Sequence, residues 1–144
     1  MRVVIQRVKS ASVSVDGEKV SEIRAGLLIY LGISVNDTAG SVEKTVNKIL
    51  NLRIFDDADG VPNLSLSEIN GEVLLVSQFT LYADIQHGRR PGYSYAAPSE
   101  QALPVYNAFL ESMKSKTSVK TGVFGAYMHV ESVNDGPYTL VYEV

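Results

Sequence analysis

The stretch "GLLIYLGI" (residues 26–33) contains no charged side chain and is apolar at nearly every position. A strand of this kind is typical of a central place in a sheet, where both faces are buried. Upstream of it, "VVIQRV" (3–8) and "ASVSV" (11–15) alternate apolar and polar residues, which predicts strands with one buried face. Asp16-Gly17 is a hairpin turn signal, and it leads into a further predicted strand, "EKVSEI" (18–23).

Two amphipathic helices are predicted downstream of the apolar strand. They lie within "NDTAGSVEKTVNKILNLRIF" (36–55) and "AAPSEQALPVYNAFLESMKSK" (96–116), where large apolar residues recur at helical spacing. The apolar stripe of the first helix is Val42, Val46, Ile49 and Leu50, and that of the second is Ala102, Tyr106, Phe109, Leu110 and Met113. Pro104 fits poorly inside a helix, so the second helix is expected to begin near it.

The remaining segments are predicted to be strands and loops. "FDDADGVPN" (55–63) is interpreted as a polar loop, and Asn70-Gly71 as the turn of a second hairpin. Two more strands are expected within "VKTGVFGAYMHVESV" (119–133) and "YTLVYEV" (138–144); the last could pair within the fold or across a dimer. This order predicts a single α+β domain (1–144), with two main helices against a mostly antiparallel, barrel-like sheet.

Composition excludes several classes of protein. Cysteine is absent, which removes disulfides, thiolate zinc sites and a cysteine nucleophile together. No apolar run approaches the roughly 20 residues that span a bilayer, and the alternating N-terminus is unlike a signal peptide, so a cytoplasmic protein is expected. The net charge of −3 disfavours a protein that binds long nucleic acids by bulk electrostatics, although a small basic contact with one RNA end is compatible with it.

Metal chemistry is not predicted. The two histidines, His87 and His129, belong to no metal-binding motif, and most histidines so placed are surface or structural residues. "DDADG" (56–60) resembles the start of a calcium-binding loop, but the position that should supply the last carboxylate is Ser67. A solvated acidic turn is the better interpretation of this segment.

The first candidate site is "SQFTLYAD" (77–84), at the polar end of the very apolar "EVLLV" (72–76). Alternation in a regular strand would put Ser77 and Thr80 on opposite faces, so both reach one substrate only if the strand bulges or ends between them. Such a break would also free backbone N–H groups, such as those of Phe79 and Thr80, to bind an anion. The plain alternative is a strand that becomes polar where it leaves the core. No base nearby in sequence would activate either hydroxyl, so a Ser-His-Asp hydrolase is not supported.

The second candidate site is "NDGPYTL" (134–140). Asn, Asp, Gly and Pro together are among the strongest turn signals, because Gly admits positive φ and Pro fixes its own φ. The alternative interpretation is that Gly136-Pro137 presents its backbone to a ligand. The residues alone leave both interpretations open.

Several short segments share their order and spacing with one known family. They are "MRVVIQRV" and "SASV" near the start, then "LRIFDD", "SQFTL", "GRRP" with "AAP" after it, "TGVFGAYM" and "NDGPYTL". Together they resemble the D-aminoacyl-tRNA deacylase family over essentially the whole chain. Gly92, directly after "RRP", departs from the family pattern, in which serine is expected, and leaves the conformation of that loop open.

The resemblance implies a homodimeric enzyme that hydrolyses the ester bond of D-aminoacyl-tRNA, without a metal or organic cofactor. Its catalytic residues would be Ser77, Gln78, Phe79 and Thr80. Ser77 and backbone amides would stabilise the oxyanion, and Thr80 would lie beside the ester. A positioned water or a ribose hydroxyl is favoured over Thr80 as the attacking group, because no base is in reach by sequence.

The substrate-binding residues that the resemblance implies are Phe124, Met128, Gly136 and Pro137. Phe124 and Met128 would cradle the 3′-terminal adenosine, with core packing as the alternative. Arg89 and Arg90 could contact phosphate or simply be solvated. Gly136-Pro137 would form a cis peptide bond and enter the active site of the partner subunit.

Recognition by backbone atoms would explain a preference for D-amino acids. If the carbonyls of Gly136 and Pro137 hold the α-ammonium, a D side chain points into open space and an L side chain strikes the dipeptide. Rejection by clash admits many D-amino acids and does not exclude glycine, so mischarged glycyl-tRNA would also be a substrate. Two alternatives stay open: an esterase of small acyl esters, and a non-catalytic dimer that binds RNA ends.

Overall fold

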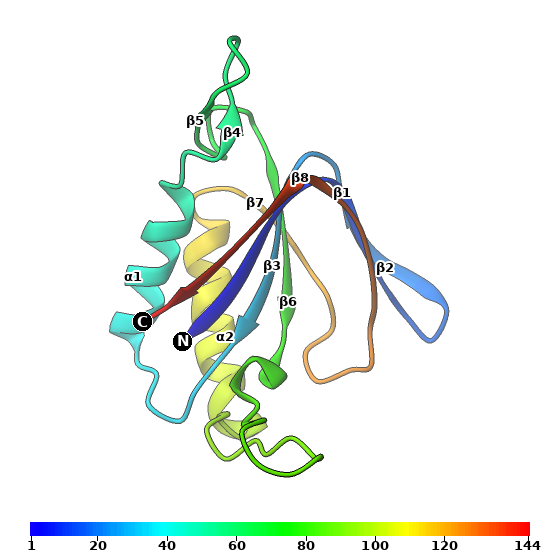
Figure 1. The fold of residues 1–144 in the computed structure, drawn as a ribbon, viewed down its shortest axis with the longest axis vertical. Helices are drawn as coiled ribbons and strands as arrows, with labels where there is room; N and C mark the ends of the chain where they lie inside the picture. The colour runs from blue at the N-terminus through cyan, green and yellow to red at the C-terminus, as the bar shows by residue number, and fades with distance from the viewer.

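A computed structural model describes all residues from Met1 to Val144 (Figure 1). Along the chain the elements are β1 Arg2–Val15, β2 Glu18–Ile23, β3 Gly26–Gly32, α1 Ala39–Leu50, β4 Phe55–Asp56, β5 Pro62–Leu64, β6 Glu72–Ser77, the 3-10 helix η1 Phe79–Tyr82, α2 Ser99–Lys114, β7 Ser118–Thr121 and β8 His129–Glu143. None of the helices combines the length and the apolar character that crossing a membrane requires.

Six strands form one strongly curved sheet (Figure 1). Its path runs β2-β1-β3-β6-β7, and β8 pairs along the other edge of β1. β1 is antiparallel to β2, β3 and β8, whereas β6 is parallel to both β3 and β7. The sheet nearly closes on itself, because the Ser21 hydroxyl of β2 donates a hydrogen bond to the Thr121 carbonyl of β7 at 2.7 Å. The predicted α+β class, with a barrel-like sheet and two main helices, is confirmed.

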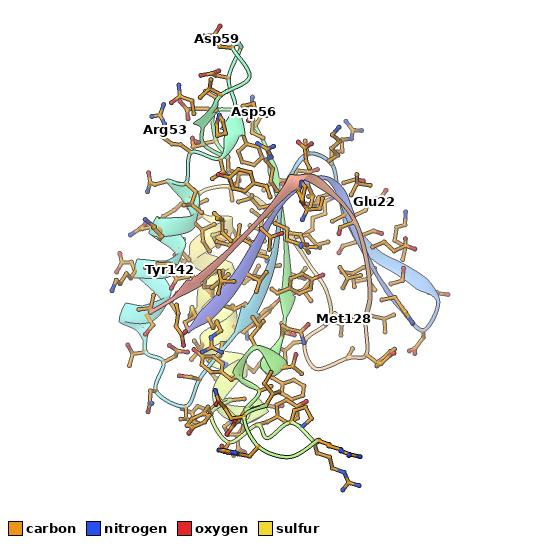
Figure 2. All side chains as sticks on the ribbon, in the orientation of Figure 1. Glu22, Arg53, Asp56, Asp59, Met128 and Tyr142 are labelled. Carbon is orange, nitrogen blue, oxygen red and sulfur yellow. The ribbon has the colours of Figure 1, made fainter.

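Both helices cover the same face of the sheet. α1 connects the parallel strands β3 and β6, α2 connects β6 and β7, and the two helices lie side by side (Figure 1). On β3, Leu27 and Ile29 belong to the core under the helices, and Leu28 belongs to a smaller cluster on the other face. All three are at most 1% exposed, which confirms the strand buried on both faces. Figure 2 shows Tyr142 beside α1 and Met128 on the opposite side of β6.

The C-terminal segment differs from the prediction. β8 runs without interruption from His129 to Glu143, where the sequence predicted a turn between two strands. Residues 135–138 form a bulge instead, since they all lie opposite the single residue Arg7 of β1. The Gly136-Pro137 peptide bond within this bulge is cis, as the family resemblance implied. The terminal strand therefore pairs within the chain, along one of its two edges.

Three local predictions were wrong. Residues 55–63 contain a small hairpin of β4 and β5 rather than only a loop. Asn70-Gly71 closes a run of turns and no hairpin, because β6, which follows it, has both edges occupied by the parallel strands β3 and β7. α2 begins at Ser99 and contains Pro104, which removes only the hydrogen bond to the Glu100 carbonyl, on an exposed turn near the helix start.

Candidate active site

The predicted catalytic segment lies where a central strand ends. β6 stops at Ser77, and the chain turns at Gln78 into η1. The Gln78 N–H donates to the carbonyl of Leu31 at 2.8 Å, which fixes this turn against β3. Since the strand ends before Thr80, the alternation that would separate the Ser77 and Thr80 side chains no longer applies. The N–H groups of Phe79 and Thr80 lie in the first turn of η1, where a helix has no preceding carbonyl of its own to bond.

A cavity of about 900 Å³, here called the main cavity, opens beside this turn. It is lined by residues 77–80 and, across from them, by Phe124 and Met128 of the loop between β7 and β8. Other parts of its wall come from β3, residues 93–99 and α2. Gly136 and Pro137 do not line it. The structure thus brings six of the eight predicted site residues together and leaves the dipeptide elsewhere.

The main cavity contains no acidic, basic or imidazole side chain. Its polar side chains are hydroxyls and one amide: Ser77, Gln78, Thr80, Tyr93, Ser94, Ser99 and Tyr127. Gln78 Nε2 donates a hydrogen bond to Thr80 Oγ1 at 2.5 Å, so the amide orients the hydroxyl but cannot take its proton. The cavity can therefore bind and polarise a carbonyl group, while this chain supplies no general base there.

Aromatic rings support the two sides of the main cavity. Phe79 is 57% exposed and packs edge-on against Tyr93, with ring centroids 4.9 Å apart. On the other side Phe124 packs against Tyr106 at 5.2 Å. Burial raises the pKa of Tyr106 to about 12, so this supporting phenol stays neutral. Phe124 and Met128 are partly buried against the two hydrophobic clusters, so core packing and contact with a ligand are compatible roles for both.

The Gly136-Pro137 bulge is held by a buried arginine. Arg7 Nε donates to the carbonyl of Asp135 at 2.9 Å, and Nη1 donates to the carbonyl of Ile54 at 2.7 Å. The guanidinium carbon lies 4.9 Å from the centroid of the Tyr138 ring. With only 7% of its surface exposed, Arg7 supports the bulge from inside the protein.

The bulge and the main cavity lie far apart within one chain. Arg2, at the start of β1, donates a hydrogen bond to the carbonyl of Leu81 in η1 at 2.5 Å, so this end of β1 adjoins the cavity. Arg7 lies further along the same strand, by about 17 Å at roughly 3.3 Å per residue. Gly136-Pro137, which Arg7 supports, is therefore remote from residues 77–80 of its own chain.

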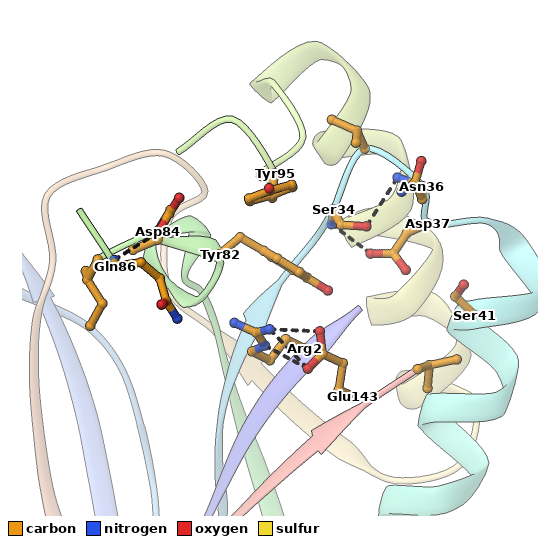
Figure 3. A pocket seen from close by; sticks show the side chains of 14 residues that line it. Arg2, Ser34, Asn36, Asp37, Ser41, Tyr82, Asp84, Gln86, Tyr95 and Glu143 are labelled. Carbon is orange, nitrogen blue, oxygen red and sulfur yellow. Dashed lines mark hydrogen bonds and ion pairs between the residues drawn. The ribbon is translucent and has the colours of Figure 1, made fainter. Parts of the chain in front are cut away.

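A second cavity of about 660 Å³, here called the side cavity, lies next to the main one. Figure 3 shows Tyr82 and Tyr95 in it, between residues 84–86 and residues 34–37. None of the predicted catalytic or substrate-binding residues lines it.

Sequence reasoning missed several aromatic residues that line these cavities, among them Tyr93, Tyr95 and Tyr127. A signal for two of them was present in "HGRRPGYSY" (87–95), where tyrosines follow a pair of arginines. Only the arginines were interpreted, because a tyrosine in a loop carries no periodic pattern that would assign it to a cavity.

The fold is that of a small α+β domain with one main cavity, and the sequence matches a known family over nearly its whole length. The family model described as D-Tyr-tRNA(Tyr) deacylase matches residues 4–143, and the chain belongs to that family. A D-aminoacyl-tRNA deacylase of Thermosipho melanesiensis is 53% identical over 143 residues, which are 98% of this chain and 95% of that protein. The D-aminoacyl-tRNA deacylase of Dictyoglomus turgidum is 51% identical over 142 residues, 98% of this chain and 91% of that protein. The resemblance found in the sequence is thereby confirmed.

Two solved structures share the fold of this chain. The protein described as c-Myc DNA Unwinding Element Binding Protein superposes with a TM-score of 0.95 at 44% identity, covering 100% of this chain and 99% of its own. A probable eukaryotic D-amino acid tRNA deacylase superposes with a TM-score of 0.86 at 17% identity, covering 99% and 98%. At that lower identity the similarity concerns the fold alone.

Proposed function

We propose that this protein hydrolyses the ester bond between a D-amino acid and the 3′ end of tRNA, releasing the free D-amino acid and the tRNA. One observation carries the proposal: the main cavity joins the turn at residues 77–80 to Phe124 and Met128 and contains no general base. The two sides of the cavity suit the two halves of such a substrate, an ester carbonyl and an adenine ring. Membership of the deacylase family supports the same reaction.

The proposed reaction needs positioning more than acid–base chemistry. A water oxygen bonds to the ester carbonyl carbon, the bond from that carbon to the ribose oxygen breaks, and one proton of the water ends on the ribose oxygen. Ser77 and the N–H groups of Phe79 and Thr80 stabilise the oxyanion in between. We assign the proton transfer to water and the neighbouring ribose hydroxyl, because no acid or base of the chain lines the cavity. Thr80, which accepts a hydrogen bond from Gln78, positions the ester rather than attacking it.

We place the Gly136-Pro137 dipeptide in the main cavity of a partner subunit, in a homodimer. Within its own chain the supporting Arg7 lies about 17 Å along β1 from the cavity end. The outer edge of β8 has no partner strand in the chain, and a long free edge favours association. Val133 and Val141 of β8 are 54% and 67% exposed, an apolar surface that a second copy would cover. A two-fold axis across β8 would bring each bulge toward the cavity end of the other subunit.

In this arrangement backbone atoms select the enantiomer. The carbonyls of Gly136 and Pro137 accept hydrogen bonds from the α-ammonium, so a D side chain points outward and an L side chain meets the dipeptide. Gly136 has a φ of +145°, and a Cβ there would lie 2.9 Å from the Tyr138 nitrogen, so only glycine adopts this backbone conformation without strain. Glycine attached to tRNA has no side chain to clash and is a second substrate. The reaction belongs in the cytoplasm, where aminoacyl-tRNA is made.

The deciding experiment compares D- and L-tyrosyl-tRNA as substrates of the purified protein. We expect the D-form to be hydrolysed far faster, with no added metal and with chelator present. Comparable rates on the two enantiomers would contradict the proposal. Rapid hydrolysis of small acyl esters that lack the adenosine would favour a general esterase instead, and binding of tRNA without turnover would favour a non-catalytic module.

A further inference from the structure

The side cavity adjoins the main cavity across a thin wall. Val35 lines both cavities, and its N–H donates to the carbonyl of Tyr95 at 3.3 Å. Tyr95 faces the side cavity, and the next residue, Ala96, lines the main cavity and forms a β-bridge with Ser34. A linear ligand that fills the main cavity can therefore continue into the side cavity by passing over the wall formed by Val35, Tyr95 and Ala96.

We propose that the side cavity binds the base of the nucleotide that precedes the terminal adenosine, and that Arg89 and Arg90 bind the phosphates beside it. Every mature tRNA ends in CCA, so this base is a cytosine. The inference rests on the proposed function, because it assumes that the terminal adenosine occupies the main cavity. It assigns a role to a cavity and a loop that the deacylation chemistry itself does not use.

The lining of the side cavity suits a flat, uncharged, hydrogen-bonding group. Tyr95 is 61% exposed as a residue and lines the side cavity, where its ring can stack on a base. Asn36 and Gln86 lie on the two sides of the cavity and carry amides that can donate to and accept from a base edge (Figure 3). The base of a nucleotide matches these groups, whereas its phosphate does not.

The three carboxylates at the side cavity are already engaged. Asp37 forms an ion pair with the N-terminal ammonium at 2.5 Å, and Glu143 forms one with Arg2 at 2.9 Å. Asp84 accepts a hydrogen bond from the backbone N–H of Gln86 at 3.0 Å. These pairings leave no free cation inside the cavity to attract a phosphate, so the anionic part of the ligand must lie outside it.

Arg89 and Arg90 carry the positive charge of the exposed loop that follows Gln86, a residue of the side cavity. They lie in the exposed loop between Asp84 and Gly92, whose ends are joined by two backbone hydrogen bonds of 2.7 and 2.9 Å. The residue after Gly92 is Tyr93, which packs on Phe79 of the main cavity, so the base of the loop is anchored at the active site. Neither arginine forms an ion pair within the chain, although most of the other basic residues do or bond a neighbouring polar group.

The first test compares D-tyrosyl-adenosine with a D-tyrosylated CCA trinucleotide, using wild type and Tyr95→Ala. We expect Tyr95→Ala to lower kcat/KM on the trinucleotide by about 5- to 150-fold, the range for loss of one base stack, and to leave kcat/KM on the nucleoside ester unchanged. Tyr95→Phe keeps the ring and should retain wild-type activity on both. An equal loss on both substrates, or no loss on either, would overturn the proposal.

The second test uses tRNA and the two arginines. Arg89→Ala and Arg90→Ala should raise KM for D-tyrosyl-tRNA with little change in kcat. In each variant the slope of log KM against the logarithm of the salt concentration should fall by about 0.7 for every phosphate that is no longer bound. Arg24→Ala is the matched control, because Arg24 is an exposed arginine just before β3, at the end of that strand remote from the cavities. A loss in the control equal to that in the loop variants would overturn the assignment to this loop.

A binding measurement separates failure of this inference from failure of the proposed function. Fluorescence anisotropy needs no turnover and compares uncharged, 5′-labelled CCA with the same trinucleotide carrying an abasic middle position. We expect tighter binding of CCA than of the abasic form by wild type, and a smaller difference in Tyr95→Ala. If the protein hydrolyses no D-aminoacyl ester but shows this pattern, the base site stands and the proposed reaction fails. If the two trinucleotides bind equally, the base site is wrong whatever the activity.

Discussion

Arg7 Nε donates a hydrogen bond of 2.9 Å to the carbonyl of Asp135, across 128 residues of sequence. Through this contact, a side chain of the first strand holds the bulge that carries Gly136-Pro137 near the end of the last strand. The same guanidinium is bonded to Ile54 and covered by the Tyr138 ring. The selectivity that we propose therefore depends on a buried residue that is remote from the main cavity of its own chain.

Replacing Arg7 by lysine should loosen the bulge. The Arg7 guanidinium donates to the Asp135 and Ile54 carbonyls at the same time, and a lysine ammonium cannot reproduce this planar arrangement of donors. Leaving one of the two carbonyls without a hydrogen bond costs about 1–3 kcal/mol. We expect a lower free energy of unfolding and, above all, a reduced ratio of D- to L-tyrosyl-tRNA hydrolysis. Denaturant unfolding and paired deacylation assays measure both, with Arg24→Lys as the exposed control. A variant with an unchanged ratio would mean that Arg7 is only structural.

Mixed dimers test whether the active site is shared between subunits. Ser77→Ala and Gly136→Ala should each reduce activity when present in both subunits. A purified dimer of one Ser77→Ala chain and one Gly136→Ala chain should regain about half of the wild-type activity, because one of its two sites is then built from unaltered parts of both chains.

The matched control for this experiment places both substitutions in one chain and pairs it with a wild-type chain. If the site is shared, both sites of that dimer are damaged, and its activity should be as low as that of the dimers carrying a single substitution in both subunits. Recovery in the control and not in the first mixed dimer would place Gly136 and Ser77 of the same chain in one site.

The Ser77 and Thr80 hydroxyls, in the turn that we propose to be catalytic, should differ in importance. Thr80→Ala is expected to cost far less than the roughly 10⁴-fold typical of a lost nucleophile, because Thr80 Oγ1 is an acceptor with no base beside it. Ser77→Ala should cost about 10²- to 10³-fold if its hydroxyl is one oxyanion donor. Single-turnover rates measure both, and an acyl group trapped on Thr80 would show that it attacks the ester.

Tyr106 should make the fold sensitive to alkaline pH. Burial raises the pKa of Tyr106 to about 12, above the usual value near 10, so the unfolded chain loses this proton first. The stabilisation is complete below about pH 10 and is lost as the pH rises toward about 12. Urea unfolding across this range should show a decline that is shallower in Tyr106→Phe; an identical decline in both proteins would mean that other groups cause it.

The sequence predicted most of the elements from local patterns. Burial determines the alternation in β1 and β2 and the continuous apolar run of β3, so periodicity predicts these strands directly. The turn at Asp16-Gly17 is predicted by its composition, because both residues have a positive φ. The errors arose where the pairing of strands determines the structure. Asn70-Gly71 has the composition of a hairpin turn, but β6 is held between parallel partners that lie far away in the sequence. No local pattern distinguishes a strand that pairs with its neighbour from one that does not.

By itself, the sequence determined the fold class, the family and the two segments at 77–80 and 134–140, because composition, periodicity and ordered motifs are properties of the chain. Only the tertiary structure decided that the first segment is a turn at the end of β6 and that the second is a bulge inside β8. The same is true of the side cavity, which joins the start of β1, the loop after β3 and the end of β8. The physical reason is that a bulge, a turn or a cavity is fixed by contacts between residues distant in sequence, such as Arg7 with Asp135, and those contacts exist only once the sheet has closed around them.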